Sequence, residues 1–479
     1  MLPSPRLTGG FKMGALWTHA DAAAATGGTA SAPFNVTGLS IDTRSLQAGD
    51  LFIALKAARD GHDFVAQAFA NGAAAALVDH IPEGVTGPCL VVPDVLKALE
   101  ALGAAGRARA QAKVVAVTGS VGKTSTKEML REMLAEFGTV HAAEASFNNH
   151  WGVPITLARL PQSADFAVIE IGMNHPGEIA PLAALTRPDV ALITTVAAAH
   201  LEAFADVAAI AREKAAIFGA LTPQGAAIYN ADLDTTPILR KAAGAQGTGF
   251  GENGDLQLAS LRHARGALVV EAKIKGESYW IRLTDSGAHF GMNALASMAV
   301  AEALGLDLAL AAQALGRWQP PAGRGKREIL ILDPVQDASF TLIDDAFNAN
   351  PASLAAALDV LANTTPGAGG RRIAILGDML ELGPQEQALH LAVATHPAMA
   401  QIDRVHCVGP RMQTLYTALP EPQRGHYVPQ AEDLGAKAHR LVHPGDVVLV
   451  KGSKGSYVSR VVDALRNLGH AQPDDPNGE

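Results

Sequence analysis

One segment of the chain, residues 113–130, has residue types and an order suited to binding a nucleoside triphosphate. A run of valines is followed by Gly119 and Gly122, and then by Lys123 and Thr124. A buried strand, a glycine turn and a helix N-terminus together direct backbone N–H groups and partial positive charge at phosphate. A lysine at this place can reach the β- and γ-phosphates, and the neighbouring hydroxyl can bind Mg2+. The segment therefore predicts a phosphate-binding loop.

The loop departs from the longer P-loop pattern G-x-x-x-x-G-K-[ST] in one position. That pattern requires glycine at position 117, where this chain has Val117. The motif is thus the shorter T-G-S-x-G-K-T form, and a helix is expected from Lys123 to about Phe137. An ordinary surface turn is the alternative interpretation. The residues expected to hold the phosphates are Gly119, Ser120, Gly122, Lys123, Thr124 and Ser125.

Two further residues, Glu170 and His200, lie near the ends of apolar runs and could bind metal. Glu170 lies near the end of the expected strand 166–171, where a carboxylate is costly unless it is paired or metal-bound. We expect a Mg2+ ligand here, with a structural ion pair as the alternative. His200 closes the run 194–200, after the expected strand 190–196, and Lys214 lies in the helical pattern 206–221 that follows. On the residues alone, His200 is more simply a satisfied core histidine.

Other polar clusters allow two interpretations. Asn148 and Asn149 could belong to a functional site, or they could simply stabilise a turn. Asn293 is expected in the first turn of a helix over 294–304, where it could contact a base or cap the helix. The turn at 43–45 (Thr43, Arg44 and Ser45) fits a solvated loop.

The elements that must position these residues alternate between strands and helices, which predicts an α/β protein with mostly parallel sheets. We expect three domains: a small N-terminal α/β domain at 1–110, a central P-loop ATPase domain at 111–320 and a C-terminal Rossmann-like domain at 321–479. The Pro/Gly-rich stretch 319–326 separates the last two. In the third domain, polar clusters follow several strands, at 344–351, 377–383 and 451–454.

Composition narrows the functional class. The chain has 479 residues, of which 48% are hydrophobic and 18% charged, and its net charge is −9. A negative chain without a basic stripe argues against a nucleic-acid partner. Two distant cysteines, no apolar run of membrane-spanning length and no signal-peptide core predict a cytoplasmic enzyme without membrane contact. Met13 is an alternative start, and the polar tail 472–479 is expected to be disordered.

Taken together, the motifs resemble the Mur ligases, the ATP-dependent amide-forming enzymes of bacterial cell-wall synthesis. The resemblance covers nearly the whole chain in order. The phosphate loop is the least specific part of it, and the pair D-D-x-x-N-A-N-P and G-D-M-x-E-L-G is the most specific. The motifs that carry it lie at 40–45, 118–124, 147–154, 169–175, 197–202, 344–351 and 376–383.

The resemblance implies a two-step reaction, in which ATP phosphorylates the carboxylate of a UDP-N-acetylmuramoyl-tripeptide and an amine then attacks the acyl phosphate. The motifs favour D-alanyl-D-alanine as the amine, because no arginine signature for meso-diaminopimelate is visible. Whether the tripeptide ends in lysine or diaminopimelate stays open, and a monomer is expected. Phe347 and Trp151 stand where relatives vary.

The resemblance also implies roles for individual residues. Lys123 and Arg324 would act at the phosphates. One Mg2+ would bind Thr124 and Glu170, and a second would bind His200. Lys214 matches a lysine that relatives carry as a carbamate, a metal-binding anion; an unmodified Lys214 paired with a carboxylate is the alternative.

For the nucleoside and the second substrate, the implied residues come from all three expected domains. Asn293 would contact adenine, while Asp345 and Asn348 would lie at the ribose end of the nucleotide. Asn148 and Asn149 would help hold phosphate or metal. The resemblance changes the interpretation of the N-terminal turn from a solvated loop to a binding site. The family binds uridine diphosphate with residues that match Thr43, Arg44 and Ser45.

Two other functions remain in view. One is a sister ligase that adds a single amino acid, or an enzyme like folylpolyglutamate synthase; both share the Gly-Lys-Thr loop but lack the two C-terminal motifs. The other is a P-loop switch or motor, which usually carries glycine at the position of Val117.

Overall fold

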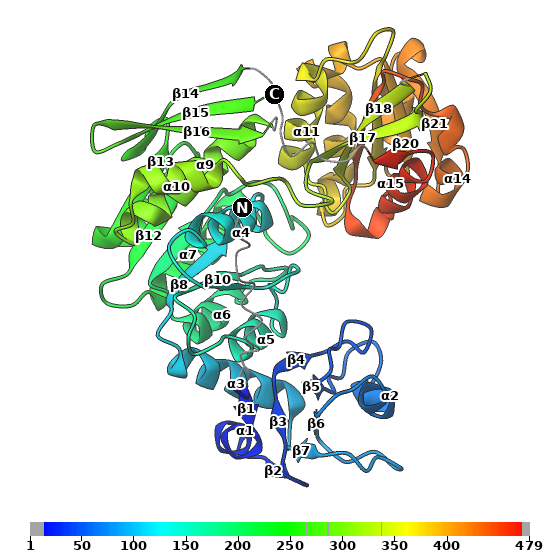
Figure 1. Cartoon of the computed structure of the whole chain (residues 1–479). Coiled ribbons are helices and arrows are strands. Elements are labelled where there is room, and N and C mark those ends of the chain that lie inside the picture. The colour runs from blue at the N-terminus through cyan, green and yellow to red at the C-terminus, as the bar shows by residue number, and fades with distance from the viewer. Residues whose placement is uncertain (1–13, 265–266, 285–286, 337, 472–479) are drawn as a thin grey trace, which may run out of the picture.

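The chain forms three sheets with helices packed on them, arranged one after another along the molecule (Figure 1). The computed structural model describes residues 14–264, 267–284, 287–336 and 338–471. Both the alternative start at Met13 and the expected disordered tail lie outside these residues. Within them, the α/β class with mostly parallel sheets is confirmed.

The N-terminal sheet has five strands in the order β2-β7-β6-β5-β4, all parallel except the β2–β7 pair. A separate two-stranded ladder joins β1 to β3. The strands are β1 (Trp17–Thr18), β2 (Thr29–Ala30), β3 (Asn35–Val36), β4 (Gly38–Ser40), β5 (Asp50–Ile53), β6 (Ala75–Val78) and β7 (Cys89–Val91). The helices are α1 (His19–Thr26), α2 (Val65–Ala70) and α3 (Val95–Arg109).

Helix α3 connects this sheet to the central one and packs tightly against α5 (Gly152–Ala158). At Gly103 the two helices approach so closely that an added Cβ would lie 2.9 Å from the carbonyl oxygen of Pro154. The absence of a side chain at Gly103 therefore permits this packing.

The central sheet has nine strands in the order β16-β15-β14-β13-β12-β11-β8-β10-β9. Its β9-to-β14 part is parallel, and β14, β15 and β16 form an antiparallel extension. The strands are β8 (Lys113–Thr118), β9 (Val140–Ala142), β10 (Phe166–Glu170), β11 (Val190–Ile193), β12 (Ala226–Asn230), β13 (Gly247–Gly251), β14 (Leu256–Ala264), β15 (Ala267–Ile274) and β16 (Glu277–Thr284).

Alternating residues of β8 divide the core into two layers, as the period of a strand requires. Val115 and Val117 belong to the layer with α4 (Lys123–Leu134), α9 (Ala288–Ala303) and α10 (Leu308–Leu315). Val114 and Ala116 belong to the layer with α5, α6 (Ile179–Thr186), α7 (Val207–Ala215) and α8 (Thr236–Ala243). The phosphate loop thus leaves a strand covered on both faces.

Two expectations about the central unit are wrong in detail. The helix expected over 294–304 begins at Ala288, so Asn293 lies in its second turn and cannot cap it. The helix starts early because Phe290 is buried against Trp318 and extends the apolar face upstream. The expected helix over 206–221 ends at Ala215 and continues only as a 3-10 turn, Ala216–Ala220.

The C-terminal sheet has the order β21-β20-β19-β22-β18-β17-β23, parallel from β21 to β18. Its strands are β17 (Lys326–Asp333), β18 (Ala338–Asp345), β19 (Arg372–Gly377), β20 (Arg404–Val408), β21 (Arg424–Val428), β22 (Val447–Lys451) and β23 (His470–Ala471). Helices α11 (Pro351–Asn363), α12 (Glu386–Ala392) and α13 (Gln413–Ala418) cover one face, and α14 (Ala431–Gly435) and α15 (Ser459–Arg466) the other.

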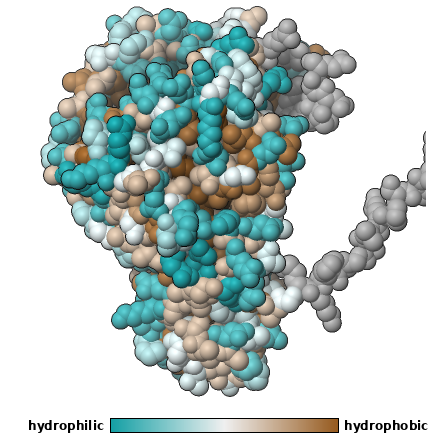
Figure 2. All heavy atoms as spheres, turned by 90° about the vertical axis from the view of Figure 1, so that its left-hand side faces the viewer, coloured by the Kyte–Doolittle hydropathy of each residue, from teal (hydrophilic) through white to brown (hydrophobic). Residues whose placement is uncertain are grey.

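The surface in Figure 2 mixes hydrophilic and apolar residues, with the apolar ones gathered about halfway up this face. Trp280, on the edge strand β16, keeps about half of its surface exposed (51%). None of the described helices is both long and apolar enough to span a membrane.

Candidate functional site

The predicted phosphate loop connects β8 to α4. Gly119 (φ 155°) and Gly122 (φ 86°) both take positive φ, and Gly122 is the N-cap of α4. A Cβ at Gly122 would lie 2.9 Å from Oδ1 of Asn293, so glycine is required for this approach. The loop and the expected adenine-contacting residue therefore adjoin each other.

The loop is held in shape by hydrogen bonds from neighbouring strand ends. The amide of Ser120 donates to the carbonyl of Thr195 (2.8 Å), and its hydroxyl donates to that of Ala197 (3.1 Å). Nζ of Lys123 donates to the carbonyl of Gly119 at 2.7 Å, which keeps the amine over the loop. Burial lowers the pKa of Lys123; Glu170 opposes this shift and Arg324 adds to it.

Thr124 and Glu170 meet as the sequence predicted. The Thr124 hydroxyl donates to Oε1 of Glu170 at 3.2 Å, and Nδ2 of Asn148 donates to the same oxygen at 2.7 Å. Glu170 is 2% exposed, and its Oε2 is buried without a hydrogen-bond partner. A buried carboxylate oxygen left unpaired beside a hydroxyl is a donor set that suits a hard cation such as Mg2+.

A cavity opens beside the loop and is closed on its far side by the C-terminal unit. Seven of the ten residues expected to bind the nucleotide line it; Gly119, Lys123 and Thr124 lie in the loop at its edge. Its empty space, including the open mouth, is about 1030 Å3, which is enough for a nucleotide, and we call it the nucleotide cavity. The seven expected residues that line it are Ser120, Gly122, Ser125, Asn293, Arg324, Asp345 and Asn348.

On the far wall, Arg324 reaches back to the phosphate loop. Its Nη2 donates to the Thr124 hydroxyl at 3.2 Å, and its guanidinium lies over the ring of Phe347, 4.1 Å from the centroid. Burial lowers the pKa of Arg324, and the carboxylates of Glu170 and Asp345 oppose this effect. The guanidinium is therefore held against the phosphate loop.

Asp345 is paired within the same wall. Nζ of Lys451, which is 2% exposed, donates to Oδ2 of Asp345 at 2.7 Å and to the carbonyl of Asn348 at 3.0 Å. Burial raises the pKa of Asp345, and Lys451 and Arg324 oppose the shift. Lys451 therefore orients the carboxylate and holds the Asn348 turn at the cavity.

His200 and Lys214 are not joined to Thr124 and Glu170 by any direct contact in the described part of the chain. His200 instead meets the C-terminal unit: its Nδ1 lies 2.6 Å from Oε2 of Glu381. Lys214 is 1% exposed, and within the described ranges its amine makes no hydrogen bond or ion pair. Burial and the nearby charge of Lys123 place the pKa of Lys214 well below its usual value.

The three residues expected at uridine diphosphate lie away from the phosphate loop. Arg44 has a side chain 86% exposed and forms an ion pair with Asp42 at 2.6 Å. The carbonyl of Thr43 accepts from Asn71. Of the three, Ser45 lines a cavity that the N-terminal sheet shares with Arg159 of the central unit.

Asn149 has a structural role that the sequence left open. Its Oδ1 accepts a hydrogen bond from the backbone amide of Gly152 at 2.9 Å, and its carbonyl accepts one from the backbone amide of Val153. These two bonds hold the first residues of α5. Asn148 and Asn149 are therefore separated in role, since only Asn148 reaches Glu170.

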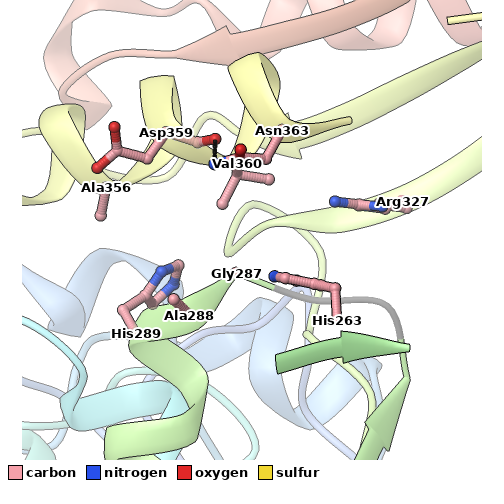
Figure 3. Close-up of a pocket in the computed structure, with 9 residues that line it drawn as sticks. All are labelled: His263, Gly287, Ala288, His289, Arg327, Ala356, Asp359, Val360 and Asn363. Carbon is pink, nitrogen blue, oxygen red and sulfur yellow. Dashed lines mark hydrogen bonds between the residues drawn. The ribbon is translucent and has the colours of Figure 1, made fainter. Parts of the chain in front are cut away.

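A second cavity lies next to the nucleotide cavity and shares His289 and Ala356 with it (Figure 3). In Figure 3, the start of α9 faces α11, with Arg327 on β17 and His263 on β14 at its side. Residues of the central and C-terminal units thus line both cavities.

One possible metal-binding cluster lies elsewhere, in the N-terminal unit. His62, Asp79 and His80 have ligand atoms within 4.8 Å of one another. The Asp79 amide donates to Nε2 of His62, and the Lys56 amine donates to Asp79. The groups therefore already satisfy one another, and the cluster is a hydrogen-bond network.

Sequence reasoning gave no role to several residues that line the nucleotide cavity. Asn230 ends β12 and Lys451 ends β22, so both carry the signal that identified Glu170, a polar side chain closing an apolar strand. His289 and Phe290 lacked such a signal, because they precede the start expected for α9. Lining residues that were given no role include Thr194, Thr195, Asn230, His289 and Phe290, whereas Lys451 lies in the polar cluster 451–454 noted in the sequence.

Comparison with known protein families gives three matches that together span most of the chain. Residues 35–137 match the model "Mur ligase family, catalytic domain", residues 117–301 "Mur ligase middle domain", and residues 332–454 "Mur ligase, glutamate ligase domain".

Individual relatives match over almost their whole length. UDP-N-acetylmuramoyl-tripeptide–D-alanyl-D-alanine ligase of Escherichia coli is 36% identical over 91% of this chain and 95% of the relative. The protein of the same name from Bacillus subtilis is 34% identical over 90% and 93%. A crystal structure of MurF from Acinetobacter baumannii has a TM-score of 0.80, 31% identity and coverage of 94% and 99%. MurF ligase from Thermotoga maritima, solved with ADP, has a TM-score of 0.75, 25% identity and coverage of 90% and 97%.

Replacing Lys123 with alanine is expected to abolish ATP turnover, with a loss of at least about 100-fold, because its amine, held over the loop by the Gly119 carbonyl, would neutralise charge on the phosphates. ADP release measures the effect. Lys113→Ala, in the same segment with a side chain 62% exposed, is the control and should stay near wild type. Near-normal turnover in Lys123→Ala would refute the phosphate site.

Asp345→Asn is expected to raise the KM for ATP about tenfold while changing kcat less. Asparagine can still accept from Lys451 but loses the charge that would hold a ribose hydroxyl. Initial rates at varied ATP separate the two constants, with Asp433→Asn, exposed on α14, as the control. An unchanged KM would place the nucleoside elsewhere.

Proposed function

This chain belongs to the Mur ligase family, and we propose that it joins D-alanyl-D-alanine to UDP-N-acetylmuramoyl-tripeptide in peptidoglycan precursor synthesis. It is an ATP-dependent ligase that forms a peptide bond. The observation that carries the proposal is similarity over nine-tenths of the chain to relatives with that named activity. The nucleotide cavity between two sheets supports it independently.

The reaction brings two anions together, the tripeptide carboxylate and the triphosphate, so concentrated positive charge is required. Lys123, the loop amides and Arg324 supply that charge from two sides of the cavity. The carboxylate would take the γ-phosphoryl group to give an acyl phosphate and ADP. The dipeptide amine would then form the amide, and phosphate would leave.

We place one Mg2+ at Thr124 and Glu170, supported by the unpaired Oε2 of Glu170. When bound, the ion would neutralise charge on the phosphates. A second would bind at His200 and Lys214, on the strength of the family resemblance. Asn148 would keep Oε1 of Glu170 oriented, so that the carboxylate presents its other oxygen.

A carbamate on Lys214 would remove the repulsion between two buried ammonium groups, those of Lys214 and Lys123. As an ammonium, Lys214 would be buried beside the like charge of Lys123, and the charge of Glu213 opposes the resulting fall in its pKa only in part. Its lowered pKa favours the neutral amine, the form that adds CO2 and releases a proton. The resulting anion would attract Lys123 instead of repelling it.

The division at 1–110, 111–320 and 321–479 is supported by the three separate sheets. The uridine diphosphate end would lie at the N-terminal sheet, where the Ser45 cavity offers Arg159 as a cationic group. We propose a monomer acting in the cytoplasm, without nucleic-acid or membrane partners.

The amine specificity is tested by measuring ADP release with UDP-N-acetylmuramoyl-tripeptide and each amine in turn. We expect release with D-alanyl-D-alanine and little with D-alanine, L-lysine, meso-diaminopimelate or glutamate. Release with a single amino acid but none with the dipeptide would favour a sister ligase. Full turnover without any amine or tripeptide would favour a P-loop switch.

The carbamate is tested with Lys214→Ala, which should lose most activity and regain part of it with formate or acetate. Wild-type protein equilibrated with 13C-labelled CO2 should show a carbamate carbonyl resonance that the variant lacks. Arg212→Ala, exposed on the same helix, is the control. Absence of both rescue and resonance would leave Lys214 an unmodified lysine.

A further inference from the structure

The ion pair between Glu381 and His200 joins the C-terminal unit to the central one, and we propose that Glu381 is a positioning residue that orients His200 for cation binding. The inference rests on the proposed function, in which His200 binds the second Mg2+. Oε2 of Glu381 lies 2.6 Å from Nδ1 of His200. A carboxylate on one ring nitrogen fixes the tautomer and leaves Nε2 as the lone-pair donor.

Backbone strain on both sides of the contact supports a functional role. His200 has φ 56° and Glu381 has φ 63°, so both take the left-handed conformation without being glycine. Such conformations persist only where the surroundings enforce them, and they cluster at functional sites. Here two strained residues, one from the central and one from the C-terminal unit, face each other across an ion pair of 2.6 Å.

The loop that carries Glu381 is anchored on each side, so the carboxylate is presented rigidly. Met379 and Leu382 are buried in the C-terminal core, and the amide of Leu380 donates to the Ser453 hydroxyl at 2.9 Å. Glu381 lies between these anchors, with its side chain 54% exposed.

The two loops also approach each other through their backbones. At Gly383 (φ 61°) an added Cβ would lie 3.1 Å from Cα of Glu202, so the small residue permits this contact. The ion pair between Glu381 and His200 therefore depends on how the C-terminal unit sits against the central one. The Glu381 carboxylate can orient His200 only when the two units are in contact. The second cation would therefore bind well only when the C-terminal unit has closed on the central one.

Binding of Mn2+, a paramagnetic substitute for Mg2+, tests this role without relying on turnover. Full-length wild type, Glu381→Ala and Glu381→Gln are titrated with Mn2+ in the presence of a non-hydrolysable ATP analogue, and free Mn2+ is followed by electron paramagnetic resonance. Loss of an outer partner of a metal-binding histidine typically weakens metal binding about 10- to 100-fold. We expect that loss for the weaker Mn2+ site in Glu381→Ala, and partial retention in Glu381→Gln, which keeps an acceptor for Nδ1–H.

Glu202→Gln is the matched control, since it removes the same charge two residues from His200, and its exposed side chain makes no ion pair in the described structure. It should bind Mn2+ like wild type. Unchanged Mn2+ binding in Glu381→Ala, or equal losses in Glu381→Ala and Glu202→Gln, would overturn the proposal. Failure of wild type to release ADP with D-alanyl-D-alanine would instead refute the proposed function, so the two failures are distinguishable.

Discussion

The structure depends on placing opposite charges together in a buried position at the ends of β8 and β10. The carboxylate of Glu170 would be costly in a strand end that is 2% exposed, were it not for Thr124, Asn148 and the nearby charges of Lys123 and Arg324. Parallel pairing aligns Glu170 with Val117, and thus brings the carboxylate to the loop. Sheet register, more than any single contact, fixes the geometry of the site.

The same charges make the site dependent on two units of the molecule. Arg324 comes from the segment that leads into β17, and Asp345 and Lys451 end neighbouring strands of the C-terminal sheet. Neither sheet alone encloses the nucleotide cavity. The phosphate end belongs to the central unit, and the opposite wall, from Asp345 to Ala356, belongs to the C-terminal unit.

The sequence predicted the phosphate loop and most of the parallel strands, because buried runs such as 114–117 and 447–450 have few alternatives. It missed the parallel strands β9, β13 and β21 and the antiparallel strands β14, β16 and β17, and in β16 apolar residues alternate with exposed polar ones. It also misplaced the start of α9, where a tertiary contact between Phe290 and Trp318 extends the helix. The meeting of Thr124 with Glu170 could be predicted from strand ends. The contact of His200 with Glu381 could not, since it depends on how two units pack.

The close packing of α3 on α5 at Gly103 has a geometric consequence for substrate choice. It fixes the N-terminal sheet against the central one, so the span between the Ser45 cavity and the phosphate loop is set by helix packing. A long substrate anchored at one end of that span must place its reactive carboxylate at the other. On the proposed function, this fixed span would make the length of the peptide a determinant of substrate choice, independent of its last side chain.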